Sequence, residues 1–182
     1  TGDPRYRDAV KGAVKRLHAQ GSSLGLVGSV IDVQNGDWLD TGSHVRGGID
    51  SYYEYLLKAW LLFGDPEFRG MWESGRDAIN LHLSHEVDGR LWYGQADMLT
   101  GERTGTRFGA LDAFLPAVHA LGGDVERAAR LQESVAFMWE TFGVEPESFD
   151  YSTMEMGHPG YPLRPEAIES AYYLFILTGD ER

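Results

Sequence analysis

The stretch Asp50-Ser-Tyr-Tyr-Glu-Tyr-Leu-Leu-Lys-Ala-Trp-Leu-Leu-Phe-Gly-Asp65-Pro66 joins a largely apolar run to a Gly-Asp-Pro corner. A run that is apolar on nearly all sides predicts a buried helix. Gly64 suits the left-handed position that ends a helix, Asp65 suits the cap of the next helix, and Pro66 suits its first turn. The stretch therefore predicts an inner helix, a tight corner and the start of a second helix.

The same corner recurs along the chain at intervals of about 60 residues. Its aspartates are Asp3, Asp65, Asp124 and Asp180. The stretches before the later corners are apolar (49–63, 111–121 and 167–177), whereas those after the corners are amphipathic and charged. Alternating inner and outer helices at this period are typical of an (α/α) toroid. We expect an all-α fold that is a partial (α/α)₇ barrel of helical hairpins, because three repeats are too few to close such a ring.

The segments that return from an outer helix to the next inner helix carry turn signals. Asn35-Gly36 lies between short β-prone runs within 30–39, which predicts a β-hairpin. The returns 91–108 and 149–161 have a similar character. We therefore expect short hairpins between the helices, with residues 1–182 forming one partial catalytic domain, namely the central repeats of a barrel whose N- and C-terminal repeats are missing.

Composition excludes several function classes. The 182 residues carry a net charge of −12 and contain no cysteine. No cluster of Lys and Arg interleaves with aromatic residues, so a nucleic-acid partner is not expected. No apolar run reaches the roughly 20 residues that span a bilayer, so no membrane insertion is expected in this segment. His82, His85 and Glu86 could bind a metal, but the solvated face of an outer helix is the favoured interpretation.

Two carboxylates occupy equivalent positions at the starts of predicted inner helices. Asp50 and Glu166 both lie in the first turn, and successive inner helices begin at the same end of a toroid. Helix capping alone could explain either residue. Their matched depth also suits glycoside cleavage, which needs an acid for the leaving oxygen and a base for water. Candidate sugar platforms are the aromatic residues Trp38, Tyr52, Tyr53, Trp92, Tyr93, Phe149, Tyr151 and Tyr161, although an aromatic stripe at helical spacing is more often core.

Three motifs carry a family resemblance. Asp50-Ser-Tyr-Tyr-Glu-Tyr-Leu-Leu-Lys58 resembles the signature of glycoside hydrolase family 47, the class I α-1,2-mannosidases. Leu163-Arg-Pro-Glu-Ala-Ile-Glu-Ser170 is similar to that family's Leu-Arg-Pro-Glu-x-x-Glu-Ser motif, and Ala113-Phe-Leu-Pro116 to its Phe-Leu-Pro stretch. Gly48 and Ala110 replace an Arg and a His of the Golgi- and ER-processing members. These departures resemble the ER-degradation-enhancing (EDEM) subgroup and its bacterial relatives, and leave the trimmed mannose branch open.

The resemblance implies an (α/α)₇ barrel that removes terminal mannose from high-mannose N-glycans by inverting, calcium-dependent hydrolysis. It assigns Glu166 as the general base and Asp50 to the acid side, acting through water. It places Arg164 and Glu169 in the sugar site, where we also expect Tyr53 and Glu54 to contact substrate. Arg164 is expected to keep Glu166 ionised.

The resemblance also implies that essential parts lie elsewhere. The family's other acid Glu would precede Thr1, and its calcium-binding Thr would follow Arg182, so we expect no metal ligand in this chain. Family members work in the secretory pathway or ER lumen of eukaryotes, or are exported or periplasmic in bacteria. The isolated chain is therefore expected to hydrolyse no Man-α-1,2-Man.

Two other functions stay open. One is an EDEM-type module that binds mannose-rich glycans in glycoprotein quality control without cutting them. The other is a different toroid enzyme, such as a glucoamylase-like hydrolase or a sugar epimerase, against which the two long motifs count. The mannosidase hypothesis requires Asp50 and Glu166 to face one common region.

Overall fold

The computed structural model describes residues 2–181, and half of the chain is helical. The helices within these residues are α1 (Pro4–Ala19), α2 (Asp50–Phe63), α3 (Pro66–His82), α4 (Leu115–Leu121), α5 (Val125–Phe142) and α6 (Glu166–Thr178), with a 3₁₀ segment, η1 (Ala110–Phe114), leading into α4. The third inner stretch was expected to be helical from residue 111. It begins as a 3₁₀ helix because Pro116, in the first turn of α4, has no N–H to donate to an earlier carbonyl.

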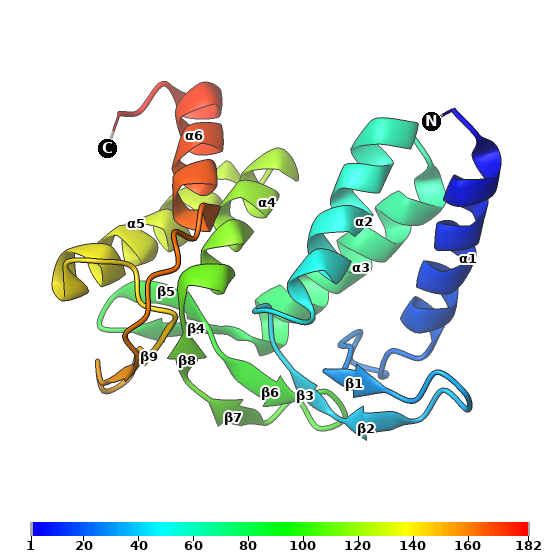
Figure 1. The fold of residues 1–182 in the computed structure, drawn as a ribbon, viewed down its shortest axis with the longest axis horizontal. Coiled ribbons are helices and arrows are strands. Elements are labelled where there is room, and N and C mark those ends of the chain that lie inside the picture. The colour runs from blue at the N-terminus through cyan, green and yellow to red at the C-terminus, as the bar shows by residue number, and fades with distance from the viewer. Residues whose placement is uncertain (1, 182) are drawn as a thin grey trace.

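The predicted alternation of inner and outer helices is confirmed. Inner helix α2 packs on outer helix α3, and inner helix α4 packs on outer helix α5 and on the next inner helix, α6 (Figure 1). In Figure 1 the inner helices α2, α4 and α6 all begin at their lower ends, on the side where the strands lie. The predicted all-α architecture with short returns is therefore the observed one.

The Gly-Asp corners have the predicted backbone geometry. Gly64 ends α2 in the left-handed region, and the side chain of Asp65 accepts a hydrogen bond of 3.0 Å from the amide of Glu67. The Asp3 and Asp124 side chains cap α1 and α5 in the same way. Each cap satisfies an amide that the first turn of a helix leaves free, so these corners are encoded locally.

The returns contain short antiparallel strands. The pairs are β1 (Val30–Ile31) with β2 (Trp38–Asp40), β3 (Gly42–Ser43) with β6 (Gln95–Asp97), β6 with β7 (Arg103–Gly105), β4 (Ser84–Val87) with β5 (Arg90–Tyr93), β8 (Arg107–Phe108) with β9 (Ser148–Asp150), and β9 with β10 (Met156–His158). Three of these pairs, β1–β2, β6–β7 and β9–β10, lie in the returns where short hairpins were expected. The pairs β3–β6 and β8–β9 join residues far apart in the sequence, and β8–β9 fixes the return that precedes α6.

One hairpin corrects the sequence interpretation. Helix α3 ends at His82, so His85 and Glu86 lie on β4 and not on an outer-helix face. Asp88 and Gly89 both have positive φ at the turn between β4 and β5. Such an Asp-Gly turn favours a two-residue hairpin, and this signal was present in the sequence.

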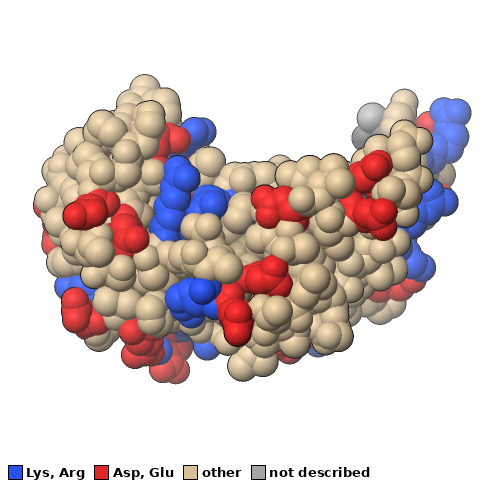
Figure 2. Space-filling view, turned by 90° about the horizontal axis from the view of Figure 1, so that it is seen from below, with Lys and Arg blue, Asp and Glu red and all other residues tan. Residues whose placement is uncertain are grey.

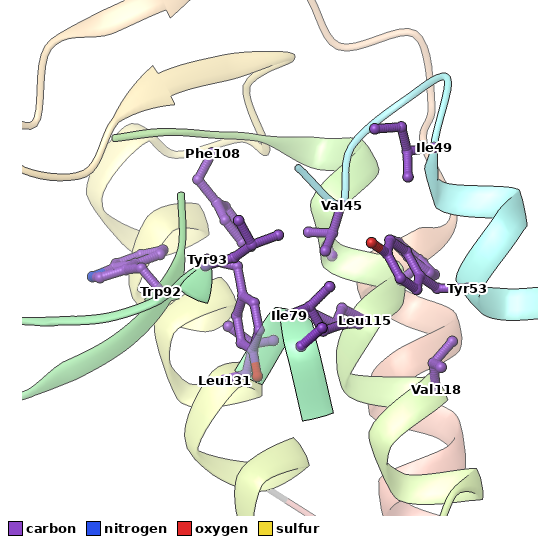
Figure 3. Packing of buried hydrophobic residues seen from close by; sticks show 14 of the residues in the cluster. Val45, Ile49, Tyr53, Ile79, Trp92, Tyr93, Phe108, Leu115, Val118 and Leu131 are labelled. Atoms are coloured by element: carbon purple, nitrogen blue, oxygen red, sulfur yellow. The ribbon is translucent and has the colours of Figure 1, made fainter. Parts of the chain in front are cut away.

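One hydrophobic core joins the helices to the strands. Figure 3 shows Leu115 of α4 close to Ile79 of α3 and Val45 of the loop before α2, with Tyr53 directed toward the same group. Next to it lies an aromatic cluster in which the ring of Trp92 stacks on Tyr151 with centroids 5.5 Å apart. Five of the candidate sugar platforms, namely Tyr53, Trp92, Tyr93, Phe149 and Tyr151, are buried in this core, so their position there corrects that expectation.

Two inner helices keep apolar side chains exposed. On α2 these include Leu61 and Leu62, and on α6 Tyr172, Phe175 and Ile176. The space-filling view in Figure 2, from the side where the inner helices begin, shows a broad arc hollowed along one edge. Within the described residues no helix is both long and apolar enough to cross a bilayer.

Candidate active site

Asp50 and Glu166 occupy the first residues of α2 and α6. Both helices begin on the same side of the arc (Figure 1). Burial is the largest cause that raises the pKa of Glu166, and the charge of Asp50 acts in the same direction, as expected for two carboxyls within electrostatic reach. The structure therefore places these two candidates around a common region.

Glu166 sits in a partly buried environment. Burial is the main cause that raises the pKa of its carboxyl, while its own amide and the Arg164 guanidinium act in the opposite direction. Its Oε2 atom is buried and has no hydrogen-bond partner within the described residues. A carboxylate of raised pKa is a stronger base, so this environment suits proton abstraction.

Arg164 has a partner that the sequence did not predict. Its guanidinium binds Glu147 through two hydrogen bonds, Nε to Oε1 at 2.7 Å and Nη2 to Oε2 at 3.0 Å. This fork holds the pKa of Glu147 below its ordinary value. The expected effect of Arg164 on Glu166 is therefore exerted from a distance, because the direct ion pair is made with Glu147.

Glu54 and Glu169 lie on facing sides of α2 and α6. The Nζ of Lys58 is 2.5 Å from Oε1 of Glu54 and 3.7 Å from Oε1 of Glu169. Lys58 thus connects the two helices near the candidate carboxylates. The positions of Glu54 and Glu169 are compatible with the substrate contacts expected of them.

Tyr53 occupies a different environment from the one expected. Its side chain is fully buried, burial raises the pKa of its phenol, and its ring packs at 5.1 Å from that of Tyr52. With no exposed surface, Tyr53 cannot contact a sugar in this arrangement. We therefore assign Tyr53 to core packing. Successive residues of a helix point in different directions, so one side of α2 can face the core while another faces the site.

The structure adds ionisable groups that sequence reasoning missed. Glu145 and Glu147 enter from the return between α5 and β9, and Glu145 is fully buried. Asp112 of η1 is also buried, and burial raises its pKa to about 7, although Arg46 opposes this rise. No signal in the sequence indicated the burial of Glu145, which lies in a return without a helical period, whereas Asp112 lies in the apolar stretch 111–121 that was expected to be an inner helix.

The resemblance implies a calcium ion, which needs several oxygen ligands placed around one point. Residues 2–181 contain no group of three or more His, Cys, Asp or Glu side chains placed to hold a metal ion. The side chains of these described residues therefore do not form a calcium site among themselves.

The comparisons with known proteins identify the family. The sequence model of glycosyl hydrolase family 47 matches residues 1–182. The chain belongs to this family. Among curated proteins, it is 38% identical to alpha-mannosidase I MNS5 of Arabidopsis thaliana over 182 residues, which is 99% of the chain and 31% of that protein. It is also 38% identical to mouse ER degradation-enhancing alpha-mannosidase-like protein 2, again over 99% of the chain and 31% of the relative.

A solved structure supports the fold of this family 47 chain. An alpha-1,2-mannosidase from Trichoderma reesei superposes with a TM-score of 0.86 at 25% identity, covering 98% of the chain and 44% of that protein. That neighbour has an (α/α)₇ barrel fold. The family 47 chain spans about a third of the length of the Arabidopsis and mouse relatives.

Proposed function

We propose that this chain forms the central part of an α-1,2-mannosidase that removes terminal mannose from high-mannose N-glycans. The observation that carries the proposal is the placement of Asp50 and Glu166 at the starts of two inner helices, within electrostatic reach of each other. Membership of family 47 supports the same reaction class. The exposed apolar sides of α2 and α6 support a larger barrel, because further repeats would cover them.

In the proposed reaction, Glu166 takes a proton from a water whose oxygen bonds to the anomeric carbon. The glycosidic C–O bond breaks at the same time, and its oxygen receives a proton through a water on the Asp50 side. Such a displacement inverts the configuration at the anomeric carbon. Arg164, Glu54 and Glu169 line the sugar site in this proposal. Calcium, when bound by residues outside this chain, would supply positive charge that holds the sugar hydroxyls.

The test uses the full-length protein that contains this chain. We expect Glu166→Gln to lower kcat for mannose release from Man-α-1,2-Man by at least about 100-fold, since the amide cannot accept the water's proton. Glu155→Gln, at an exposed glutamate of the β9–β10 hairpin, is the control and should leave the rate unchanged. An unchanged rate for the Glu166→Gln variant would contradict the role of Glu166 as the base. A rate that does not change when a chelator is added would contradict the dependence on calcium.

A second candidate is a module that binds mannose-rich glycans without cleaving them. It is favoured by similarity to relatives named ER degradation-enhancing alpha-mannosidase-like proteins and by Gly48 and Ala110 in the motifs. Glycan binding by the full-length protein, with no mannose release, would support this function over the first.

A further inference from the structure

Glu145 differs from every other acidic residue near the site. Its side chain has no exposed surface, and neither carboxyl oxygen has a hydrogen-bond partner within residues 2–181. Its neighbour Glu147, two residues along, has both oxygens bound by Arg164. A buried carboxylate without a partner is costly, so Glu145 needs either a proton or a ligand.

The charges around Glu145 favour a proton. Burial is the first cause that raises the pKa of Glu145 to about 8, and the charges of Glu166 and Glu147 act in the same direction. Arg164 opposes them, but its hydrogen bonds go to Glu147. Two further charged groups act on the neighbours of Glu145. Asp50 contributes to raising the pKa of Glu166, and His158 contributes to lowering the pKa of Glu147. Burial and the neighbouring charges therefore favour the protonated form of Glu145 at neutral pH.

Glu166 offers the matching acceptor. Its Oε2 atom is also buried without a partner, and the two hydrogen bonds from Arg164 to Glu147 bring the return that carries Glu145 beside the residues that precede Glu166. A protonated carboxyl has one O–H to donate, and a carboxylate oxygen can accept it. The Glu145 carboxyl comes from the return after α5, and the Glu166 carboxylate comes from the first turn of α6. The first can donate a hydrogen bond and the second can accept it.

We propose that Glu145 is a positioning residue that donates its carboxyl hydrogen to Glu166, directly or through one water, and thereby holds Glu166 ionised and oriented toward the attacking water. A hydrogen bond to the charged form of Glu166 favours that form. When Glu145 loses its proton, the donor is lost and a second negative charge faces Glu166. The inference rests on the proposed function only for the catalytic consequence, whereas the pairing of the two carboxyls stands independently.

The kinetic test compares Glu145→Gln with Glu145→Leu in the full-length protein. Gln keeps a hydrogen-bond donor but cannot ionise, while Leu fills similar space without a donor. We expect Glu145→Leu to lower kcat for Man-α-1,2-Man by about 10- to 100-fold with little change in KM, the usual effect of losing a hydrogen bond to a charged group. Glu145→Gln should restore at least about tenfold of this loss. We expect the unaltered protein to lose activity above about pH 8, where Glu145 ionises, and we expect Glu145→Gln to shift that loss to higher pH.

A spectroscopic test does not depend on activity. Infrared difference spectra at pH 6.5 should show a protonated-carboxyl C=O band that is absent from Glu145→Gln and shifted by Glu166→Gln. Asp112→Asn is the control, because it removes a different buried carboxyl and should leave the Glu145 band in place. Thermal unfolding of each variant separates loss of the pair from loss of the fold.

The outcomes separate the two hypotheses. A Glu145 band that responds to Glu166→Gln in a protein without mannosidase activity would support the pairing and contradict the proposed function. The absence of that band at pH 6.5 would overturn the pairing. Full activity of Glu145→Leu with an unchanged pH profile would overturn the positioning role.

Discussion

Helices α4 and α6 are both apolar inner helices, yet they differ in burial. Six of the seven residues of α4 are buried, including Leu115 and His119. In α6, which is rich in large apolar side chains, only Ala167, Ser170 and Leu174 are buried. Apolar composition therefore marks a helix for burial, but it does not supply the neighbours that bury it.

The neighbours explain the difference. Helix α4 packs against α5, α6, η1 and α2, so partners lie around most of its circumference. Helix α6 packs against α4, α5 and η1, which lie on one side of it. Its other side carries Ile168, Tyr172 and Ile176, which remain exposed. The family 47 relatives are about three times as long, so further repeats could cover this side.

The largest effect is expected in α4. Leu115→Ala should destabilise the protein by about 2–5 kcal/mol, because it removes a fully buried side chain and leaves a cavity in a packed region. The matched control is Leu99→Ala at an exposed turn, which should change the free energy of unfolding by less than about 0.5 kcal/mol. Urea unfolding measures both, and equal losses would contradict the contrast in burial.

The hydroxyl of Ser170 links the buried side of α6 to the backbone of η1 and α4. Ser170 Oγ donates to the carbonyl of Ala113 at 2.6 Å and accepts from the amide of Ala117 at 3.0 Å. Ser170→Ala should cost about 2–3 kcal/mol in unfolding free energy, since two buried backbone groups lose a partner. The control is Ser134→Ala, where the buried hydroxyl donates only to its own helix, at Arg130. A smaller loss for Ser170→Ala than for Ser134→Ala would refute this link between α6 and α4.

His119 makes α4 sensitive to acid. Burial lowers its pKa to about 3, and its Nε2 lies 3.1 Å from the hydroxyl of Tyr93. Between pH 6.5 and 3 the unfolded chain binds a proton that the folded chain does not, so stability is complete above pH 6.5 and falls with pH. The loss between pH 7 and 5 from this residue should be about 2 kcal/mol. Unfolding measured against pH should show a shallower slope for His119→Gln than for the unaltered protein.

The smallest effect is expected on the exposed side of α6. Phe175→Ala should change the stability of the 182-residue chain by less than about 0.5 kcal/mol, because Phe175 is 45% exposed there. In the full-length protein we expect a larger loss, since another repeat would bury this ring. Equal effects in the two proteins would contradict the proposal that α6 is covered in the complete barrel.

Much of the site could be predicted because it is encoded locally. Asp50 and Glu166 follow from their distance to the corner that ends each helix, and the observed helices begin at these residues. Glu145 could not be predicted, because it lies in the return after α5, where no apolar period indicates that its side chain is buried. The Arg164–Glu147 pair joins residues 17 apart through a return without regular period, so no sequence pattern indicated it.

The sequence by itself determined the corners, the alternation of inner and outer helices and the positions of the two candidate carboxylates. These depend on capping side chains, glycine conformations and apolar spacing within a few residues. Only the tertiary structure decided that Tyr53 lies in the core, that α4 is enclosed while α6 is half exposed, and that the carboxyl of Glu145 is buried without a partner among the described residues. The physical reason is that the burial and ionisation of a side chain depend on neighbours from distant segments. Helix caps and turns, in contrast, form from residues within one short segment of the sequence.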